Sequence, residues 1–252
     1  MISAVVLSQN DVQKIGQTLG SLVFCDEVIV IDDNSIDKTP DIAKKFGAKI
    51  FSHSLNNDFA QQRNFGLVKA KGDWVLFVDS DEIVPLDLAK EIIEKIAMNV
   101  SGFYIKRRDF MWGRELKYGE MGNVRLLRLA KKTAGKWVRP VHEVWSPDAK
   151  AMGDKDTLGE LVHPLEHYPH QDVAQFIEEI NRYSTINAKH FYDTGIRTNI
   201  FQIVAYPVAK FFVNYVWRLG FLDGTPGAIV AFLMSLHSFL TRGKLYLLAR
   251  KK

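Results

Sequence analysis

Short apolar blocks alternate with amphipathic stretches over the first hundred residues of the chain. Blocks rich in β-branched residues predict strands, and apolar residues three or four positions apart predict helices. The predicted strands are 2–7, 27–31, 48–52 and 74–78, and the predicted helices are 12–22, 58–70 and 86–97. Strands that alternate with helices form a parallel sheet with crossover connections. The pattern therefore predicts an α/β fold with a doubly wound, mostly parallel sheet flanked by helices.

A further helix is indicated by its start and stop signals. Thr39 is suited to the N-cap, with Pro40 in the first helical position, and Gly47 is suited to the end of the helix. The turn Asp32-Asp33-Asn34-Ser35 separates this helix from the strand before it. We expect the helix to begin after Thr39.

Two of the predicted strands end in paired acids. Asp32 and Asp33 follow one strand, and Asp79 and Asp81 follow the apolar block Trp74–Val78. Acids before a helix are also common caps, and an Asp-x-Asp pair arises by chance in chains of this size. Ligands of doubly wound sheets bind beyond the carboxyl ends of the strands, where both pairs would lie. Their shared position favours a site, with oxygens suited to a hard divalent cation.

The composition restricts the class of protein. With 252 residues, 47% hydrophobic, the chain can bury a substantial core. Its one cysteine, Cys25, excludes an internal disulfide, and residues 1–10 lack the features of a secretory signal. No Gly-x-Gly-x-x-Gly fingerprint follows the first strand, and no Walker lysine loop occurs, which argues against dehydrogenases and P-loop enzymes.

Basic residues gather in two blocks although the net charge is only +4. Residues 106–139 hold eleven Lys or Arg against three acids, and residues 199–252 hold seven against one. These blocks indicate a negatively charged partner, either a phosphorylated acceptor or an anionic membrane surface. The aromatic residues do not interleave with the basic ones in a nucleic-acid-binding motif, so we expect no nucleic-acid partner.

Several motifs in order resemble family 2 glycosyltransferases, which have the GT-A fold. Four blocks in the first hundred residues carry the resemblance: Ala4–Asn10, Val28–Thr39, Gln62–Gly66 and Val78–Glu82. Three later blocks are similar to the branch that includes lipopolysaccharide-core β-glycosyltransferases: Pro140–Glu143, Asn181–Ser184 and Arg218–Gly227.

The resemblance implies a nucleotide-sugar site at these strand ends. Asp33 would contact the nucleotide base, Arg63 the base or phosphates, and Asp79 the ribose, while Asp81 would bind Mg²⁺ or Mn²⁺. Ser8 and Gln9 would line the same donor pocket, for which a UDP-sugar is the expected donor. Many relatives place an aromatic residue near Gln9 to stack on the base, and this chain does not.

The resemblance also implies a catalytic base. A sugar leaves its diphosphate through a cation-like transition state, and the attacking acceptor hydroxyl must lose its proton as the new bond forms. By family placement Glu143 is the candidate for this base, and His142 would orient it. The alternative is that both belong to a hydrogen-bonded loop. An α-linked donor would give a β-linked product.

Three histidines, His163, His167 and His170, lie in a segment with two prolines, where we expect a loop. Their spacing matches no common structural zinc site, and partner cysteines are missing, so we expect no zinc. His167 is the candidate from this segment for the donor's metal or phosphates, with a packing role as the alternative.

The C-terminal third has a different composition. Residues 199–217 are nearly all apolar or aromatic, and Pro207 is expected to break them, while residues 227–240 are uncharged but short for a bilayer core of roughly 30 Å. We expect amphipathic helices that lie on an anionic leaflet, with a subunit interface in a homo-oligomer as the alternative. The candidate surface residues are Phe211, Phe212, Tyr215, Trp217 and Phe221.

These observations predict a metal-dependent, inverting hexosyltransferase. It would move a sugar from a nucleotide donor to an anionic glycolipid, of the lipopolysaccharide core or another lipid-linked glycan, as a peripheral protein on the cytoplasmic side of the inner membrane. Residues 1–100 would bind the donor, 101–170 the acceptor, and 171–252 the membrane or another subunit. The alternatives are a nucleotidyltransferase, whose usual lysine-containing loop is absent near Ser8, and a non-catalytic nucleotide-sugar-binding scaffold.

Overall fold

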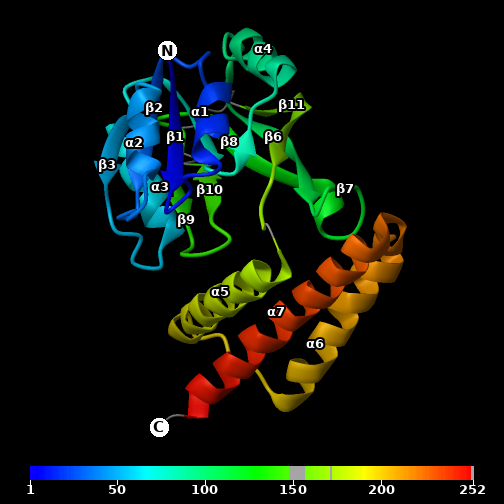
Figure 1. The fold of residues 1–252 in the computed structure, drawn as a ribbon. Helices are drawn as coiled ribbons and strands as arrows, with labels where there is room; N and C mark the ends of the chain where they lie inside the picture. Colours follow the sequence, from blue (N-terminus) through cyan, green and yellow to red (C-terminus); the bar gives the residue numbers. More distant parts are fainter. Residues whose placement is uncertain (148–156, 171, 251–252) are drawn as a thin grey trace. The chain divides into compact units, whose positions relative to one another are not determined.

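The computed structural model describes residues 1–147, 157–170 and 172–250, and the chain divides into two compact units (Figure 1). The first unit comprises Met1–Arg107 and Arg125–His167, and the second comprises Arg108–Val124 and Tyr168–Lys252. We describe each unit by itself.

A sheet of parallel and antiparallel strands organises the first unit. Its four parallel strands are β3 (Lys49–Ser52), β2 (Glu27–Asp32), β1 (Ile2–Ser8) and β4 (Trp74–Asp79), in that order across the sheet. The sheet continues with β8 (Val124–Lys131), β6 (Val100–Met111), β11 (Thr157–His167) and β5 (Glu82–Ile83). Strand β8 runs antiparallel to β4. All four predicted strands are present, which confirms the α/β fold.

The helices of the first unit cover both faces of the parallel strands, as Figure 1 shows. Ala4 and Val6 of β1 pack in one apolar cluster with helices α1 (Ile15–Ser21), α2 (Thr39–Lys45) and α4 (Leu86–Lys95). Val5 and Leu7 pack in a second cluster with helix α3 (Phe59–Lys69). Successive residues of a strand point to opposite faces, so burial on both faces produces the unbroken apolar blocks of the sequence.

Two helices begin at other residues than the sequence predicts, α2 one residue earlier and α1 three residues later. Thr39 is the first residue of α2 and not its N-cap, because its hydroxyl accepts the Asp11 N–H at 2.8 Å. Helix α1 begins at Ile15, since the preceding chain is held in a turn in which the Val12 N–H is bound by the Asp37 carboxylate at 3.3 Å. Gly47 adopts a left-handed φ of 76° at the end of α2, as its glycine signal predicts.

The segment with the three histidines is a strand for most of its length. His163 and His167 lie in β11, which pairs antiparallel with β5 through Glu166 and His167. The loop prediction was therefore wrong for these residues. Proline excludes a helix but is tolerated at ladder positions where its missing N–H is not needed.

A short hairpin completes the first unit. It consists of β9 (Gly135–Val138) and β10 (Val144–Pro147), in which Trp137 pairs with Trp145. Both indole rings pack on Phe77 of β4, with ring centroids 5.0 and 5.8 Å from that of the phenyl ring. The hairpin thereby holds the segment just before β10, which contains Glu143, close to the parallel strands.

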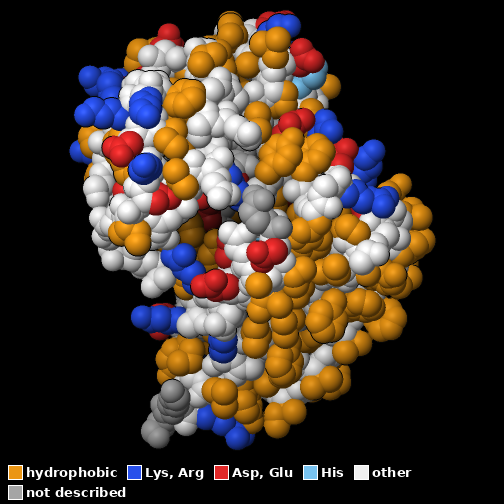
Figure 2. All heavy atoms as spheres, in the orientation of Figure 1, with side chains coloured by type: hydrophobic (Ala, Val, Ile, Leu, Met, Phe, Trp, Pro, Cys, Tyr) orange, Lys and Arg blue, Asp and Glu red, His pale blue; other side chains and the backbone are white. Residues whose placement is uncertain are grey.

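The second unit is mainly helical. It contains β7 (Arg114–Leu116), α5 (Val173–Asp193), α6 (Ile200–Phe212) and α7 (Gly224–Arg250), with α7 packed against both α5 and α6. Helix α6 continues through Pro207, contrary to the predicted break, and the Ser235 hydroxyl of α7 donates to the Pro207 carbonyl at 2.7 Å. Hydrophobic side chains cover the visible face of α6 and α7 (Figure 2). By length and composition alone, Ile200–Trp217 and Gly220–Arg250 could each cross a membrane.

The carboxylate of Glu27 joins three segments at the start of β2. It accepts hydrogen bonds from the Ser3 hydroxyl at 2.7 Å and the Lys71 N–H at 2.9 Å, and it pairs with Lys49 Nζ at 2.6 Å. Burial opposes ionisation of this group, but the hydrogen bonds to Lys49, Ser3 and Lys71 outweigh it and lower the pKa of Glu27 to about 2.

This lowered pKa predicts a loss of stability in acid. The carboxylate binds protons less readily in the folded than in the unfolded chain, so its stabilisation is complete above about pH 4.5 and is lost as the pH falls toward 2. In urea titrations, E27Q should be less stable than the wild type at neutral pH and should lose less stability over that acid range. An equal acid-induced loss in both proteins would contradict this role for Glu27.

Gly66 allows α3 to approach the sheet closely. A Cβ atom at this position would overlap Cγ1 of Val5 and lie 3.2 Å from Cγ1 of Ile31. We expect Gly66→Ala to destabilise the protein by about 1–3 kcal/mol in denaturant unfolding, because the packed core cannot take up the extra methyl group. The control is Gly20→Ala in α1, where the nearest atom is Phe46 Cε1 at 3.7 Å and the change should be neutral or stabilising. Equal stabilities of the two variants would contradict the close approach.

Candidate active site

The parallel strands place their last residues at one edge of the sheet. Ser8 of β1 pairs with Asp32 of β2, and Leu7 of β1 pairs with Asp79 of β4. The residues that follow these strands therefore leave the sheet at the same level. This edge brings together the segments that contain Ser8, Asp33 and Asp79.

Asp79 is held between two buried arginines. Its Oδ1 accepts from Arg63 Nη2 and its Oδ2 accepts from Arg128 Nη2, both at 2.6 Å. Burial alone would raise the pKa of Asp79, but the two guanidinium groups outweigh it and hold the pKa far below its usual range. The carboxylate is consequently ionised at every physiological pH.

Arg63 reaches this position from the buried side of α3. Its Nε donates to Glu143 Oε1 at 2.7 Å, and its guanidinium carbon lies 4.9 Å from the centroid of the Trp137 ring. Arg63 therefore links Asp79 of β4 to Glu143, which precedes β10. The structure brings together three of the residues selected from the sequence, Arg63, Asp79 and Glu143.

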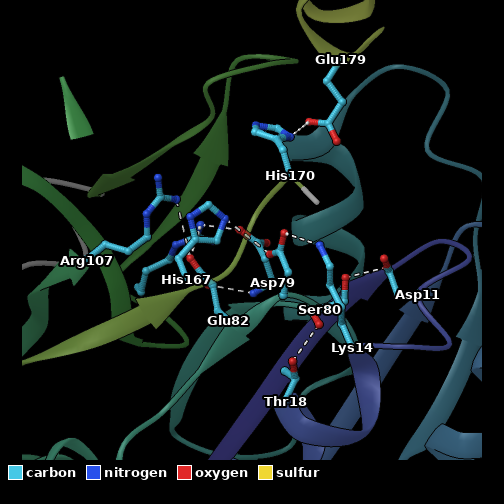
Figure 3. Close-up of polar contacts among 12 residues, drawn as sticks. Asp11, Lys14, Thr18, Asp79, Ser80, Glu82, Arg107, His167, His170 and Glu179 are labelled. Carbon is cyan, nitrogen blue, oxygen red and sulfur yellow. Dashed lines mark hydrogen bonds and ion pairs between the residues drawn. The ribbon is translucent and has the colours of Figure 1, made fainter. Parts of the chain in front are cut away.

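Glu82 contacts the backbone of Asp79 and two arginines. Its Oε2 accepts the Asp79 N–H at 2.8 Å, and its Oε1 lies 3.6 Å from Arg128 and 3.7 Å from Arg107 (Figure 3). Burial and the neighbouring charge of Asp79 raise the pKa of Glu82 against the effect of the arginines. Within the described residues, several buried polar atoms of this cluster have no hydrogen-bond partner: Arg63 Nη1, Arg128 Nε, Arg128 Nη1 and Glu82 Oε1.

Asp81 faces a histidine and a lysine and not the arginines. His167 Nε2 lies 3.5 Å from its Oδ1, and Lys14 Nζ lies 3.7 Å from its Oδ2. Burial opposes ionisation of Asp81, but His167 outweighs it and lowers the pKa of this carboxyl group. The structure thus brings His167, the histidine selected from the sequence, to the second acid of the Asp-x-Asp pair.

The protein supplies two candidate ligands for a divalent cation here. In the described parts of the chain, no group of three or more His, Cys, Asp or Glu side chains could hold a metal. Mg²⁺ is usually bound by one or two protein ligands together with substrate phosphates and water, and not by a cage of side chains. Asp81 and His167 fit that kind of shared site, whereas they do not fit a closed structural zinc site.

The nucleotide-binding candidates form a separate group at the ends of β1 and β2. The Asp33 N–H donates to the Ser8 carbonyl at 2.9 Å, and Gln9 Nε2 donates to the Asp33 carbonyl at 3.1 Å. Asp33 Oδ1 accepts the Leu55 N–H at 3.0 Å, which fixes the direction of its carboxylate. Ser8, Gln9 and Asp33 are therefore neighbours.

Three residues of this region were not selected from the sequence. Arg128 lies in the basic block, and only the antiparallel pairing of β8 with β4 reveals its contact with Asp79. Lys14 lies beside Asp81, and Asp11 accepts from the Ser80 hydroxyl at 2.6 Å (Figure 3). In strand Val124–Lys131, Arg128 stands between Leu127 and Leu129, and this position among apolar residues was a usable signal, since a buried arginine requires partners.

The aromatic candidates belong to the second unit. Phe211 stacks on Tyr215 with centroids 5.4 Å apart, and Tyr215 meets the edge of Phe221 at 6.2 Å. Phe212 is exposed, and Trp217 is 85% exposed.

Known proteins of one family are similar to this chain. The family model described as "Glycosyl transferase family 2" matches residues 3–142, which is more than half of the chain. A lipopolysaccharide core biosynthesis glycosyltransferase, LpsC of Rhizobium meliloti (strain 1021), is 27% identical over 97% of this chain and 92% of its own length. An uncharacterized glycosyltransferase of Rickettsia typhi is 25% identical over 99% of this chain and 88% of its own length.

Two groups of solved structures share the fold. S. aureus TarS 1-349 in complex with UDP-GlcNAc has a TM-score of 0.52 and 17% identity, over 94% of this chain and 91% of that one. Glucosyl-3-phosphoglycerate synthase from Mycobacterium tuberculosis, in complex with Mn²⁺, UDP and phosphoglyceric acid, has a TM-score of 0.51 and 20% identity, over 79% of this chain and 80% of that one. Together with the family match, the fold shows that this chain belongs to glycosyltransferase family 2 and is a glycosyltransferase of the GT-A type.

Proposed function

We propose that this glycosyltransferase is metal-dependent and inverting, and that it moves a hexose from a UDP-sugar to an anionic glycolipid. The observation that carries the proposal is the end of β4, where Asp79 is locked by two arginines while Asp81 faces His167 and Lys14 at 3.5 and 3.7 Å. One acid of the pair is therefore fixed in place, and the next is placed to bind a cation.

The donor would lie across the edge of the sheet. Ser8, Gln9 and Asp33 would contact the base, and Asp79 would accept from a ribose hydroxyl, since each carboxylate oxygen can accept more than one hydrogen bond. The unpartnered Arg63 Nη1, in the part of the chain that the structure describes, supports an anionic group nearby. The complexes of TarS with UDP-GlcNAc and of the synthase with UDP support a uridine nucleotide.

Asp81 and His167 would hold Mg²⁺ or Mn²⁺ together with the donor's diphosphate. Bound there, the ion would offset the negative charge that develops on the departing nucleoside diphosphate. The presence of Mn²⁺ in the related synthase structure supports this assignment. Lys14, which lies 3.7 Å from Asp81, adds positive charge on the protein's side.

Glu143 would act as the base toward the acceptor hydroxyl. Its Oε1 accepts from Arg63 Nε at 2.7 Å, which fixes its orientation. In the described residues Oε2 has no hydrogen bond, so it can approach the attacking hydroxyl and take its proton. Attack from the face opposite the diphosphate would invert the anomeric configuration and give a β-linked product from an α-linked donor.

The acceptor and the location follow from the relative and from the second unit. The similarity to LpsC supports an acceptor of the lipopolysaccharide core or a related lipid-linked glycan. The exposed apolar side chains of α6 and α7 support peripheral attachment to the cytoplasmic side of the inner membrane, and a homo-oligomer is the competing use of the same surface. In this proposal residues 1–100 bind the donor, 101–170 contribute acceptor contacts, and 171–252 attach the enzyme.

Asp81→Asn tests the donor and metal site. UDP with Mn²⁺ at 100 times the dissociation constant should stabilise the wild type by about 2.7 kcal/mol, which corresponds to roughly 5–10 °C for a chain of this size. The variant should lose most of this shift and at least about 100-fold in turnover, because the cation loses its carboxylate ligand. The control, Asp87→Asn, changes an exposed acid of α4 and should keep both. A full thermal shift in Asp81→Asn would contradict the metal role.

Glu143→Gln tests the base. The amide oxygen can still accept from Arg63, so the dissociation constant for UDP with Mn²⁺ should stay within about threefold, while kcat should fall by roughly 10²- to 10⁴-fold because the amide cannot take a proton. Calorimetry and steady-state kinetics measure the two effects. Glu160→Gln, which alters an exposed partner of Arg125, should leave both unchanged. An unchanged kcat in Glu143→Gln would remove the residue from this role.

A further inference from the structure

The segment Arg218–Gly227 forms a tight turn at the start of α7 in the second unit. Leu219 has a left-handed φ of 57°, and a Cβ on Gly220 would lie 2.6 Å from the Asn214 carbonyl oxygen. Asp223, only 2% exposed, accepts the N–H groups of Lys117 and Tyr118 at 3.1 and 2.9 Å. The Asp223 carboxylate therefore stabilises the fold around the turn, whereas the side chain of Arg218 is exposed on the surface.

An open cavity of about 270 Å³ lies beside this turn. It is lined by Arg218 together with the segment after β7, namely Lys117, Tyr118, Gly119, Glu120, Gly122 and Asn123. Since a water molecule occupies about 30 Å³ of liquid, a phosphate group with several waters fits this volume. The cavity lies entirely within the second unit.

The charge of the cavity is positive. Its one carboxylate, Glu120, is neutralised by Lys210 Nζ at 3.1 Å and also accepts from Asn214 Nδ2 at 3.0 Å. Among the described residues, the Arg218 guanidinium has no hydrogen-bond or ion-pair partner. Lys117 has only a long ion pair, 3.8 Å, with Glu115, whose carboxylate is bound by Arg108 at 3.0 and 3.2 Å. Two cations are therefore available to an anionic ligand.

The residues next to Arg218 in the sequence, which we call the rim, are apolar and exposed. Arg218 is flanked in sequence by exposed hydrophobic residues: Val216, Trp217, Leu219, Phe221 and Leu222. From Asn199 to Arg250 the only acid is the buried Asp223, so α6, α7 and the turn between them present no carboxylate to a negatively charged surface. Aromatic residues beside cations are typical of protein surfaces that meet the headgroup level of a membrane.

We propose that this cavity binds the phosphate of a membrane lipid headgroup while Trp217 and its apolar neighbours enter the leaflet. Lys117 and Arg218 neutralise the phosphate, and Arg218 can bind two of its oxygens at once. The site deepens the proposed membrane attachment and rests on it, and it assigns to the Arg218–Gly227 motif a binding role in addition to its structural one. It is independent of the donor pocket.

The test is sedimentation of the full chain with phosphatidylcholine vesicles that contain phosphatidic acid, without donor or metal. The pocket variant is Lys117→Gln/Arg218→Gln. The control, Lys45→Gln/Lys71→Gln, removes the same charge from two exposed lysines of the first unit. We expect the wild type and the control to bind alike and the pocket variant to bind at least about tenfold more weakly. Equal losses in the two variants would overturn the pocket and leave only a general attraction of basic surface to anionic lipid.

Two further measurements test whether the rim enters the leaflet and whether the bound phosphate belongs to a lipid or is free in solution. Acyl-brominated lipids should quench the fluorescence of the wild type. Trp217→Phe should remove most of this quenching, because Trp217 is 85% exposed, whereas Trp74, Trp137 and Trp145 are buried and Trp112 packs partly buried against an apolar cluster of the second unit. Quenching that persists in Trp217→Phe would overturn the insertion of the rim. A third outcome is that inorganic phosphate stabilises the wild type but not the pocket variant, and that neither protein binds vesicles. This result would assign the cavity to free phosphate and overturn the proposal of a lipid headgroup.

Failure of this site is distinguishable from failure of the proposed transfer reaction. Stabilisation of the pocket variant by UDP with Mn²⁺ reports on the donor site alone and should equal that of the wild type. A pocket variant that loses vesicle binding but keeps this stabilisation supports the lipid site. If the pocket variant still unfolds cooperatively but loses both vesicle binding and stabilisation by UDP with Mn²⁺, the lipid site and the donor site are not independent, and this part of the proposal is overturned.

Discussion

The ion cluster around Asp79 is the interaction on which the active site depends. Two arginines from α3 and β8 meet this one carboxylate, and Arg63 continues to Glu143 ahead of β10. Four segments that are distant in the sequence are thereby joined at one point. Removing one partner from a buried ion pair leaves an uncompensated charge, which costs far more than the pair itself contributes. The cluster therefore fixes the relative positions of the strand end and the candidate base more firmly than apolar packing alone would.

The charge balance of this cluster supports the proposal of a cation at Asp81. Three guanidinium groups, those of Arg63, Arg107 and Arg128, face the three carboxylates of Asp79, Glu82 and Glu143. When all are ionised, little positive charge remains for a diphosphate that enters the site. The additional charge must come from elsewhere. In the described part of the chain, Lys14 and His167 lie 3.7 and 3.5 Å from Asp81, which is the acid outside the arginine cluster. In the proposed function, a divalent ion held by Asp81 and the phosphates would supply the positive charge that the paired arginines cannot.

Most of the fold could be predicted from the sequence, because strands and helices leave local patterns in it. The site could be predicted only in part. Burial on both faces makes β1, β2 and β4 continuous apolar blocks, and their ends mark Asp33, Asp79 and Asp81 directly. Arg128 depends on the pairing of β8 with β4 across about fifty residues of chain, which no local pattern contains. Thr39 was assigned as an N-cap because its hydroxyl can cap a helix, but the Asp11 N–H competes for it in the folded protein. The errors thus occur where a tertiary contact uses a group that local rules assign elsewhere.

The motif Arg218–Gly227 shows how structure and binding can share one segment. Its glycines and Asp223 serve the turn, because Gly220 has no room for a side chain and Asp223 satisfies two backbone N–H groups. A turn this constrained gives Arg218 a fixed starting point, and side chains on a rigid backbone lose less entropy when they bind. The apolar neighbours of Arg218 remain exposed, Trp217 most of all at 85%. Exposed apolar area of this kind is costly in water, so its placement beside two cations is best explained by a surface that is apolar and anionic at once.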